Sequence, residues 1–250
     1  MNHAILRFYA ELNDFLPVEL RQRTLRRWFD GPAPVKDVIE ACGVPHTEVD
    51  VVLVNGDRVD FGCPVSDGDR VTAYPRFRLL DPAPADRLQP AMLADPRFVL
   101  DVHLGRLASY LRLAGFDVAY RRDCSDAELA LVSHDQDRIL LTRDRELLKR
   151  SIVERGYWVR DTRPPRQFAE VVRRFDLAER MMPLTRCARC NAVLTGVSRD
   201  AVADRLPPLV KLGRDTFRQC PGCERVYWDG THVEQIRRIL ANALTAPPGD

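Results

Sequence analysis

The sequence predicts a chain that combines an α+β segment, an α/β segment with a parallel sheet and a zinc-binding segment. Residues 1–75 run strand, helix, hairpin and strand, while residues 97–180 alternate strands with helices. Two Cys-x-x-Cys pairs lie in the last third of the chain. The first pattern is typical of an α+β roll, and the alternation is typical of a parallel sheet sandwiched by helices. Paired Cys-x-x-Cys motifs are typical of a tetrahedral zinc site.

The first segment is expected to begin with a strand over residues 3–9 and to continue with a short helix from Pro34. An apolar strand over residues 49–54 runs into Asn55-Gly56, which is the strongest short hairpin signal. A last strand is predicted over residues 70–74. Strand, helix and hairpin within about seventy residues give the α+β roll.

Residues 79–96 are expected to form a linker between the first two segments. A continuous helix or a central strand is excluded there by five prolines in or next to the linker: Pro75, Pro82, Pro84, Pro90 and Pro96. Proline lacks the backbone N–H and fixes φ, so the linker is expected to be semi-rigid.

The α/β segment is expected to contain four strands and four helices. The strands are predicted at residues 98–100, 117–120, 139–141 and 157–159. The helices are predicted at residues 104–114, from Ser125, at residues 145–155 and around residues 168–175. A further helix is predicted near the end of the chain, from about Val233.

Four cysteines are predicted to hold one zinc ion: Cys187, Cys190, Cys220 and Cys223. Two residues between the ligands of each pair let both thiolates reach one tetrahedral ion. Four protein ligands leave no open position, so the zinc is expected to be structural. The 29 residues between the pairs require a hairpin insertion. The alternatives are four unligated buried cysteines, or a redox dithiol, which would need only one pair.

Three further cysteines, Cys42, Cys63 and Cys124, are expected to be buried structural thiols.

No run of eighteen apolar residues is present, and the N-terminus lacks the basic start and apolar run of a signal peptide, so a cytoplasmic protein without a membrane span is expected. Residues 1–90 carry 11 basic and 14 acidic groups, against 27 and 22 in the remaining 160 residues. The basic groups are nearly all arginine, which is compatible with a nucleic-acid partner.

Carboxylates follow two of the predicted strands. Asp101 comes directly after one strand and Asp144 after another, and the carboxyl ends of parallel strands share one rim of a sheet. Asp126 and Glu128 open a helix that can approach the same rim. Such acids repel one another unless cations screen them, and hard oxygen ligands favour Mg²⁺ or Mn²⁺. The chemistry that uses such a cluster is phosphodiester cleavage.

Arginines accompany these acids in the sequence. Arg106, Arg112 and Arg143 are predicted to bind substrate phosphates, with Arg145 close to them.

The acids also have structural interpretations. Ser125-x-x-Glu128 is a capping box, and Asp126 in the first turn complements the helix dipole. Asp101 and Asp144 are each placed to cap the helix that comes next.

The α/β segment, together with the cysteine-containing segment after it, resembles the Mut-seven C-terminal RNase family, a PIN-like nuclease domain with a zinc ribbon behind it. The likeness is carried by residues 98–101, 104–108, 111–117, 126–129, 138–147 and 226–232. Ser109-Tyr110 departs from a common arginine-tryptophan pair, and His103 stands where the family usually has methionine. The resemblance implies that Asp101, Asp126 and Asp144 bind the catalytic metal.

The first segment resembles small ubiquitin-like β-grasp proteins that carry sulfur, through Val54-Asn55-Gly56 and residues 67–71. Such carriers need an exposed C-terminal Gly-Gly, whereas this chain continues through residues 74–77. The resemblance therefore implies the fold and not sulfur transfer, and a role in recruiting a protein partner or shaping the substrate is expected instead. The missing Gly-Gly disfavours the alternative of a sulfur-carrier-like partner in cofactor synthesis.

The expected organisation is a ubiquitin-like β-grasp domain over residues 1–78, the linker, a PIN-like domain over residues 97–182, and a zinc ribbon with a C-terminal helix over residues 183–250. The expected function is a Mg²⁺- or Mn²⁺-dependent ribonuclease that hydrolyses RNA phosphodiester bonds. The alternative is a non-catalytic RNA-binding or regulatory protein with a PIN-like fold.

Overall fold

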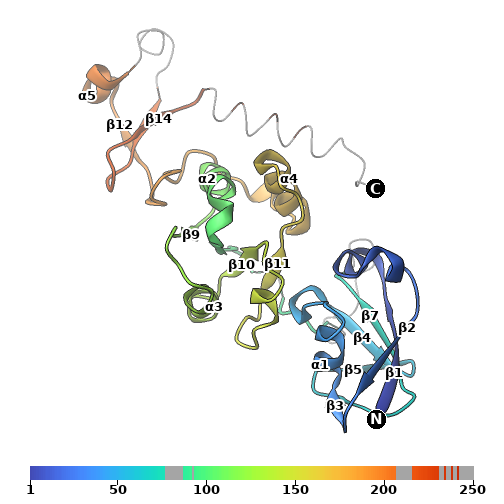
Figure 1. Ribbon diagram of the computed structural model, residues 1–250. Coiled ribbons are helices and arrows are strands. Elements are labelled where there is room, and N and C mark those ends of the chain that lie inside the picture. The colour runs from blue at the N-terminus through green and yellow to red at the C-terminus, as the bar shows by residue number, and fades with distance from the viewer. Residues whose placement is uncertain are drawn as a thin grey trace. The chain divides into compact units, whose positions relative to one another are not determined.

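The computed structural model describes residues 1–76, 87–91, 93–206 and 216–230, together with residues 234, 238 and 241. The chain forms two compact units, and each unit takes in two stretches of sequence. The first contains Met1–Leu93 and Asp126–Trp158, and the second contains Ala94–Ser125 and Val159–Asp250. Figure 1 labels most of their helices and strands. The compact units therefore do not follow the order of the predicted segments.

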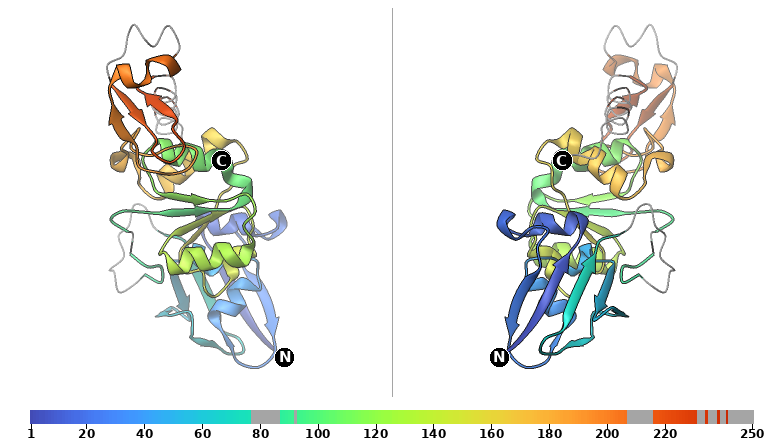
Figure 2. Two further views of the ribbon diagram at one scale, coloured as in Figure 1. Left: turned by 90° about the vertical axis from the view of Figure 1, so that its left-hand side faces the viewer. Right: turned by 90° about the vertical axis from the view of Figure 1, so that its right-hand side faces the viewer.

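The N-terminal part of the first unit is a mixed five-stranded sheet in the order β2-β1-β7-β4-β5. Its elements are β1 (Asn2–Phe8), β2 (Leu25–Phe29), β4 (Val51–Val54), β5 (Asp57–Val59) and β7 (Arg70–Tyr74), with the helix α1 (Val35–Glu40). Strands β1 and β7 are parallel, and the other pairs are antiparallel. Figure 2 shows these strands from two sides, coloured blue to cyan. The predicted β-grasp fold is confirmed.

Alternation of side chains explains how this sheet builds its core. Along β1, Ala4, Leu6 and Phe8 are buried while the residues between them are more exposed, as the period of two in a strand requires. Val38 and Ile39 of α1 join the same core. The hairpin between β4 and β5 has φ of 55° at Asn55 and 97° at Gly56, which is the pattern of a type I′ turn.

Three strands of this part were not predicted. The short strands β3 (Ala33–Pro34) and β6 (Pro64–Val65) pair with each other. Strand β2 lies at the edge of the five-stranded sheet, and its central residues 26–28 are exposed. Because an exposed edge strand buries neither face fully, its sequence lacks the apolar alternation on which the prediction relied.

The second stretch of the first unit contains α3 (Asp126–Asp135), β10 (Ile139–Thr142) and β11 (Gly156–Trp158). Strands β10 and β11 are parallel. The predicted helix over residues 145–155 is wrong, because this segment forms only a 3₁₀ turn at Leu147–Lys149. The Asp144 carboxylate accepts the N–H of Glu146 at 2.8 Å, which caps the start of this turn. Arg150 is extended with ψ of 128°, so the helical turn ends there.

Arg145 joins this stretch to the N-terminal part of the same unit. Its guanidinium lies 3.9 Å from the centre of the Trp158 ring and 5.2 Å from that of Phe15. It also donates hydrogen bonds to the carbonyls of Asp14 and Phe15 at 3.2 and 3.1 Å. Arg145 therefore has a structural role within the first unit.

The second unit begins with β8 (Phe98–Leu100), α2 (Gly105–Leu113) and β9 (Val118–Tyr120), and continues with α4 (Pro164–Arg174). Strands β8 and β9 are parallel, which, with the parallel pair β10–β11, confirms the predicted α/β fold. Helix α2 buries Leu107, Ala108 and Leu111. It ends at Gly115, where φ is 104° and a side chain would collide with the Met182 carbonyl.

The last part of the second unit is an antiparallel sheet in the order β12-β13-β14, as a zinc ribbon requires. Its elements are β12 (Thr195–Val197), α5 (Arg199–Val202), β13 (Phe217–Gln219) and β14 (Val226–Trp228). Strands β12 and β13 form the predicted hairpin between the cysteine pairs, and α5 lies in the chain that connects them.

Some predictions fall on residues that are not described. They are His232 at the ribbon end, most of the C-terminal helix from Val233, and residues 79–86 and 92 of the linker. In the described part of the chain, no helix is long and apolar enough to cross a membrane.

Candidate functional site

The two Cys-x-x-Cys pairs come together at one end of the ribbon. The Sγ atoms of Cys187, Cys190, Cys220 and Cys223 all lie within 4.8 Å of one another. Sγ atoms of the two pairs approach to 3.5 Å between Cys187 and Cys223 and to 3.3 Å between Cys190 and Cys220. In a tetrahedral site with Zn–S bonds of about 2.3 Å, neighbouring sulfurs are roughly 3.8 Å apart. The four thiols therefore fit a zinc ion.

Tyr227 on β14 supports this cluster. Its hydroxyl lies 3.1 Å from the Cys187 Sγ and accepts the N–H of Ala188, also at 3.1 Å. Burial opposes ionisation of the Cys187 thiol, but the hydrogen bonds from Tyr227 and from the backbone of Cys190 and Arg189 lower its pKa to about 6. The fixed hydroxyl therefore favours the thiolate that a metal needs.

Arg112 connects α2 to the first cysteine pair. Only 5% of its surface is exposed, and burial lowers the pKa of its guanidinium. Its Nε and Nη2 donate to the carbonyl of Val118 at 3.1 and 2.8 Å, and Nη1 donates to the carbonyls of Ala188 and Arg189 at 3.4 and 2.8 Å. Arg112 was expected to bind phosphate, but this geometry gives it a structural role in the second unit.

Asp101 follows β8 directly, as predicted, and is 6% exposed. Its carbonyl accepts the N–H of Leu104 at 2.9 Å, and its carboxylate makes no capping bond to the adjoining 3₁₀ turn. A buried acid at the carboxyl end of a strand lies where ligands of α/β proteins bind.

The other predicted acids belong to the first unit. Asp126 and Glu128 are exposed in the first turn of α3. Asp144 is exposed after β10, and its Oδ1 accepts the N–H of Glu146 at 2.8 Å. Within the described residues, the four cysteines form the one group of three or more potential ligands whose atoms all lie within 4.8 Å. Convergence of the acids on one cation therefore stays a prediction.

A hollow of about 800 Å³, which we call the basic hollow, lies beside the carboxyl ends of β8 and β9. It is lined by residues 103, 105, 106, 109, 112, 120, 122, 162, 164, 167, 188 and 189. Among these, Arg106, Arg122 and Arg189 are exposed arginines. Of the predicted phosphate ligands, Arg106 and the buried Arg112 line this hollow. Arg143 follows β10 in the first unit and is half-buried.

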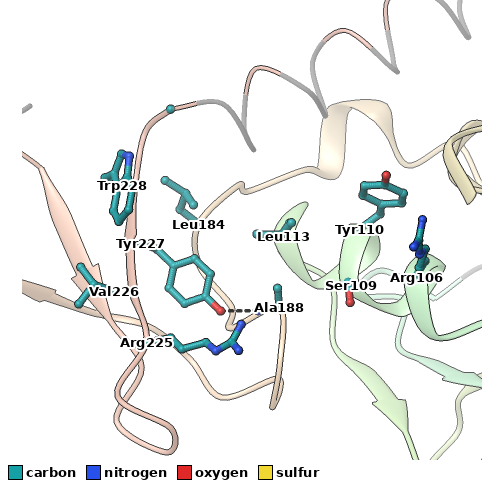
Figure 3. A pocket seen from close by; sticks show the side chains of 11 residues that line it. Arg106, Ser109, Tyr110, Leu113, Leu184, Ala188, Arg225, Val226, Tyr227 and Trp228 are labelled. Atoms are coloured by element: carbon teal, nitrogen blue, oxygen red, sulfur yellow. Dashed lines mark hydrogen bonds between the residues drawn. The ribbon is translucent and has the colours of Figure 1, made fainter. Parts of the chain in front are cut away.

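A second hollow of about 610 Å³ lies between α2 and β14 (Figure 3). We call it the ribbon groove. Its walls carry Arg106, Tyr110 and Leu113 from α2 and Arg225, Val226, Tyr227 and Trp228 from the ribbon. Arg189 and Arg225 were given no role from the sequence, and Tyr227 was named only within residues 226–232, which carry the family likeness. Their positions next to the metal-binding cysteines were the one available signal, because nothing in a sequence shows which helix a ribbon strand faces.

The chain thus combines three parts: a ubiquitin-like β-grasp sheet, an α/β part with parallel strand pairs, and a ribbon with four clustered cysteines. This combination defines its class. The family model of the Mut7-C RNAse domain matches residues 96–240, and that of the Mut7-C ubiquitin domain matches residues 1–81. The chain therefore belongs to the Mut7-C RNase domain family, as the sequence predicted.

Among solved structures, the crystal structure of small archaeal modifier protein 1 from H. volcanii is similar to part of this chain. The two are 22% identical, with a TM-score of 0.25. The match covers 31% of this chain and 100% of that protein. No curated protein matches the chain.

Proposed function

We propose that the protein is a metal-dependent ribonuclease that hydrolyses RNA phosphodiester bonds. The observation that carries this proposal is the Mut7-C RNAse domain match over residues 96–240, which includes Asp101, Asp126, Asp144 and all four ribbon cysteines. Buried Asp101 at the end of β8 and the basic hollow beside that strand end support the same function.

In this proposal Asp101, Asp126 and Asp144 hold Mg²⁺ or Mn²⁺, and Glu128 assists them. Such a cation activates a water and neutralises the leaving oxyanion. Arg106 and Arg143 bind substrate phosphates, because guanidinium groups suit bidentate contacts with them. Arg112 is not assigned to phosphate, because its donors are already bonded to the backbone carbonyls of Val118, Ala188 and Arg189.

The zinc is structural in this proposal, since four thiolates leave no open coordination position. The ribbon extends the RNA-binding surface, and the ubiquitin-like segment recruits a protein partner or shapes the substrate. We assign the activity to the cytoplasm.

The test compares RNA cleavage and RNA binding by the wild-type protein and Asp144→Asn. The variant is expected to lose Mn²⁺-dependent cleavage by about a hundredfold or more while its RNA affinity stays within about twofold. The matched control is Glu146→Gln, which removes one exposed carboxylate two residues away. Equal cleavage by Asp144→Asn and the wild type would overturn the assignment of this acid.

The alternative is a non-catalytic RNA-binding protein. It is favoured by the hydrogen bond between the Asp144 carboxylate and the N–H of Glu146, which already gives this acid a structural role. If the wild-type protein with Mn²⁺ binds single-stranded and structured RNAs but leaves all of them intact, this alternative replaces the nuclease.

A further inference from the structure

The ribbon groove is lined on one side by a single face of α2. Arg106, Tyr110 and Leu113 line it and are spaced by four and three residues, so they share one face of the helix. The adjacent face is buried in the second unit through Leu107 and Leu111. The groove-lining face therefore presents a ring, an aliphatic side chain and a cation.

The other side of the groove is held in place by the zinc ribbon. Tyr227 lies in β14 and Arg225 directly precedes this strand. Figure 3 shows both side chains directed toward α2. The Tyr227 hydroxyl is fixed by Ala188 and Cys187 at 3.1 Å, so its ring has one orientation. Two tyrosines and two arginines thus line a preformed hollow.

The charge of the groove selects its occupant. None of the described residues that line the ribbon groove or the basic hollow is an aspartate or glutamate. The two hollows share Arg106, Ser109 and Ala188, so they adjoin one another. Aromatic rings interleaved with arginines, without acids, match a polyanion with flat apolar bases.

We propose that the ribbon groove binds an unpaired stretch of RNA. A base stacks on Tyr110 or Tyr227, Arg106 and Arg225 contact the flanking phosphates, and the strand continues through the basic hollow toward the end of β8. A base paired in a duplex cannot offer its face to the tyrosines, so the groove selects single strands. This inference rests on the proposed ribonuclease function and names the form of RNA that the enzyme takes.

The test measures the binding of a fluorescent 12-nucleotide oligouridine by anisotropy, without added divalent metal, so that cleavage does not interfere. Arg225→Ala is expected to weaken binding about three- to tenfold and to lower the salt dependence by roughly 0.7, the share of one phosphate contact on a single strand. Tyr110→Leu is expected to weaken binding about tenfold, because stacking is lost. The same strand in a duplex is expected to bind less tightly than the free strand.

Three controls separate recognition from folding. Tyr110→Phe keeps the ring and is expected to bind within about twofold of the wild type. Arg58→Ala removes one exposed arginine that lines neither hollow, and it is expected to leave affinity unchanged. Zinc content and the thermal transition of each variant, measured in parallel, show that the ribbon has folded.

The outcomes distinguish this inference from the proposed function. If Arg225→Ala and Tyr110→Leu bind the oligonucleotide as tightly as the wild type, or if the duplex binds more tightly, the groove proposal is wrong even where Mn²⁺-dependent cleavage is present. If both variants weaken binding but the wild type cleaves no RNA, the groove proposal stands and the nuclease proposal is wrong.

Discussion

Tyr227 is the residue at which the cysteine cluster and the ribbon groove meet. Burial raises the pKa of the Cys187 thiol, but the Tyr227 hydroxyl, together with backbone N–H groups, lowers it to about 6. The Tyr227 ring also lines the groove. One side chain therefore serves the ribbon's metal site and the surface that we assign to RNA.

Tyr227→Phe is expected to weaken zinc binding about 10- to 100-fold, the usual cost of losing a partner of a metal ligand. Without the hydroxyl the pKa of Cys187 rises, so protons compete better with zinc, and the loss is expected to be larger at about pH 6 than at about pH 8. Competition with a chromophoric chelator at both pH values measures the zinc affinity of the variant and of the wild type. Tyr110→Phe is the control, and equal zinc affinity in the two variants would contradict this role.

Cys42 is expected to be the least reactive of the three thiols outside the cluster. Burial raises its pKa to about 11, although Arg27 opposes the shift, so about one thiol in a thousand is ionised at pH 8. Iodoacetamide at that pH is expected to modify Cys63 and Cys124 well before Cys42, with mass spectrometry as the readout. Faster alkylation of Cys42 would show that its surroundings are more open.

At the residue scale, sequence spacing predicted the four cysteines because a metal demands fixed ligand geometry. Strand ends predicted the position of Asp101 for a similar reason. Arg112 was misassigned because the sequence alone does not show whether a helical arginine binds a phosphate or donates to buried backbone carbonyls. Only the approach of residues 188–189 to α2 decides between these roles.

At the scale of elements, Arg112 ties together α2, β9 and the first cysteine pair. Arg112→Met keeps much of the side-chain volume but leaves three carbonyls without their donor. We expect it to lower the free energy of unfolding by about 2–3 kcal/mol. Urea denaturation of the zinc-loaded protein measures the change, with exposed Arg106→Met as the control. A loss no greater than that of the control would refute the structural role.

Arg145 is the corresponding connection in the first unit, between the ubiquitin-like sheet and the segment after β10. Arg145→Lys keeps the charge but loses the planar group that stacks on Trp158 and donates to two carbonyls. We expect it to cost about 1–2 kcal/mol of stability. Thermal denaturation beside the exposed Arg150→Lys tests this, and indistinguishable transitions for the two variants would count against it.

Elements with a clear apolar period were predictable, and those fixed by side-chain bonds were not. Helix α4 was found from Phe168, Val171 and Val172, which lie on one face. The helix predicted over residues 145–155 is wrong because the backbone becomes extended at Arg150 after a single 3₁₀ turn. Arg145 in this segment donates to the carbonyl of Phe15, a distant partner that a periodic pattern does not reveal.

At the scale of the whole molecule, the order of folds along the chain was predictable, from the β-grasp through the α/β segment to the ribbon. The grouping into compact units was not predictable, because residues 126–158 belong to the same compact unit as the N-terminal part. The contacts responsible, such as that between Trp158 N–H and the Glu48 carboxylate at 2.7 Å, link positions 110 residues apart. No local pattern encodes a pairing of that separation.

We propose that a nuclease site with its own catalytic cation accompanies a structural zinc. The most direct measurement is the rate at which the purified protein cleaves a labelled RNA before and after Mn²⁺ is added, with bound zinc quantified throughout. We predict about one equivalent of zinc that mild chelation leaves in place, with cleavage that appears only on addition of Mn²⁺ and is lost in Asp101→Asn. RNA that stays intact with Mn²⁺, or cleavage that Asp101→Asn retains in full, would contradict the account.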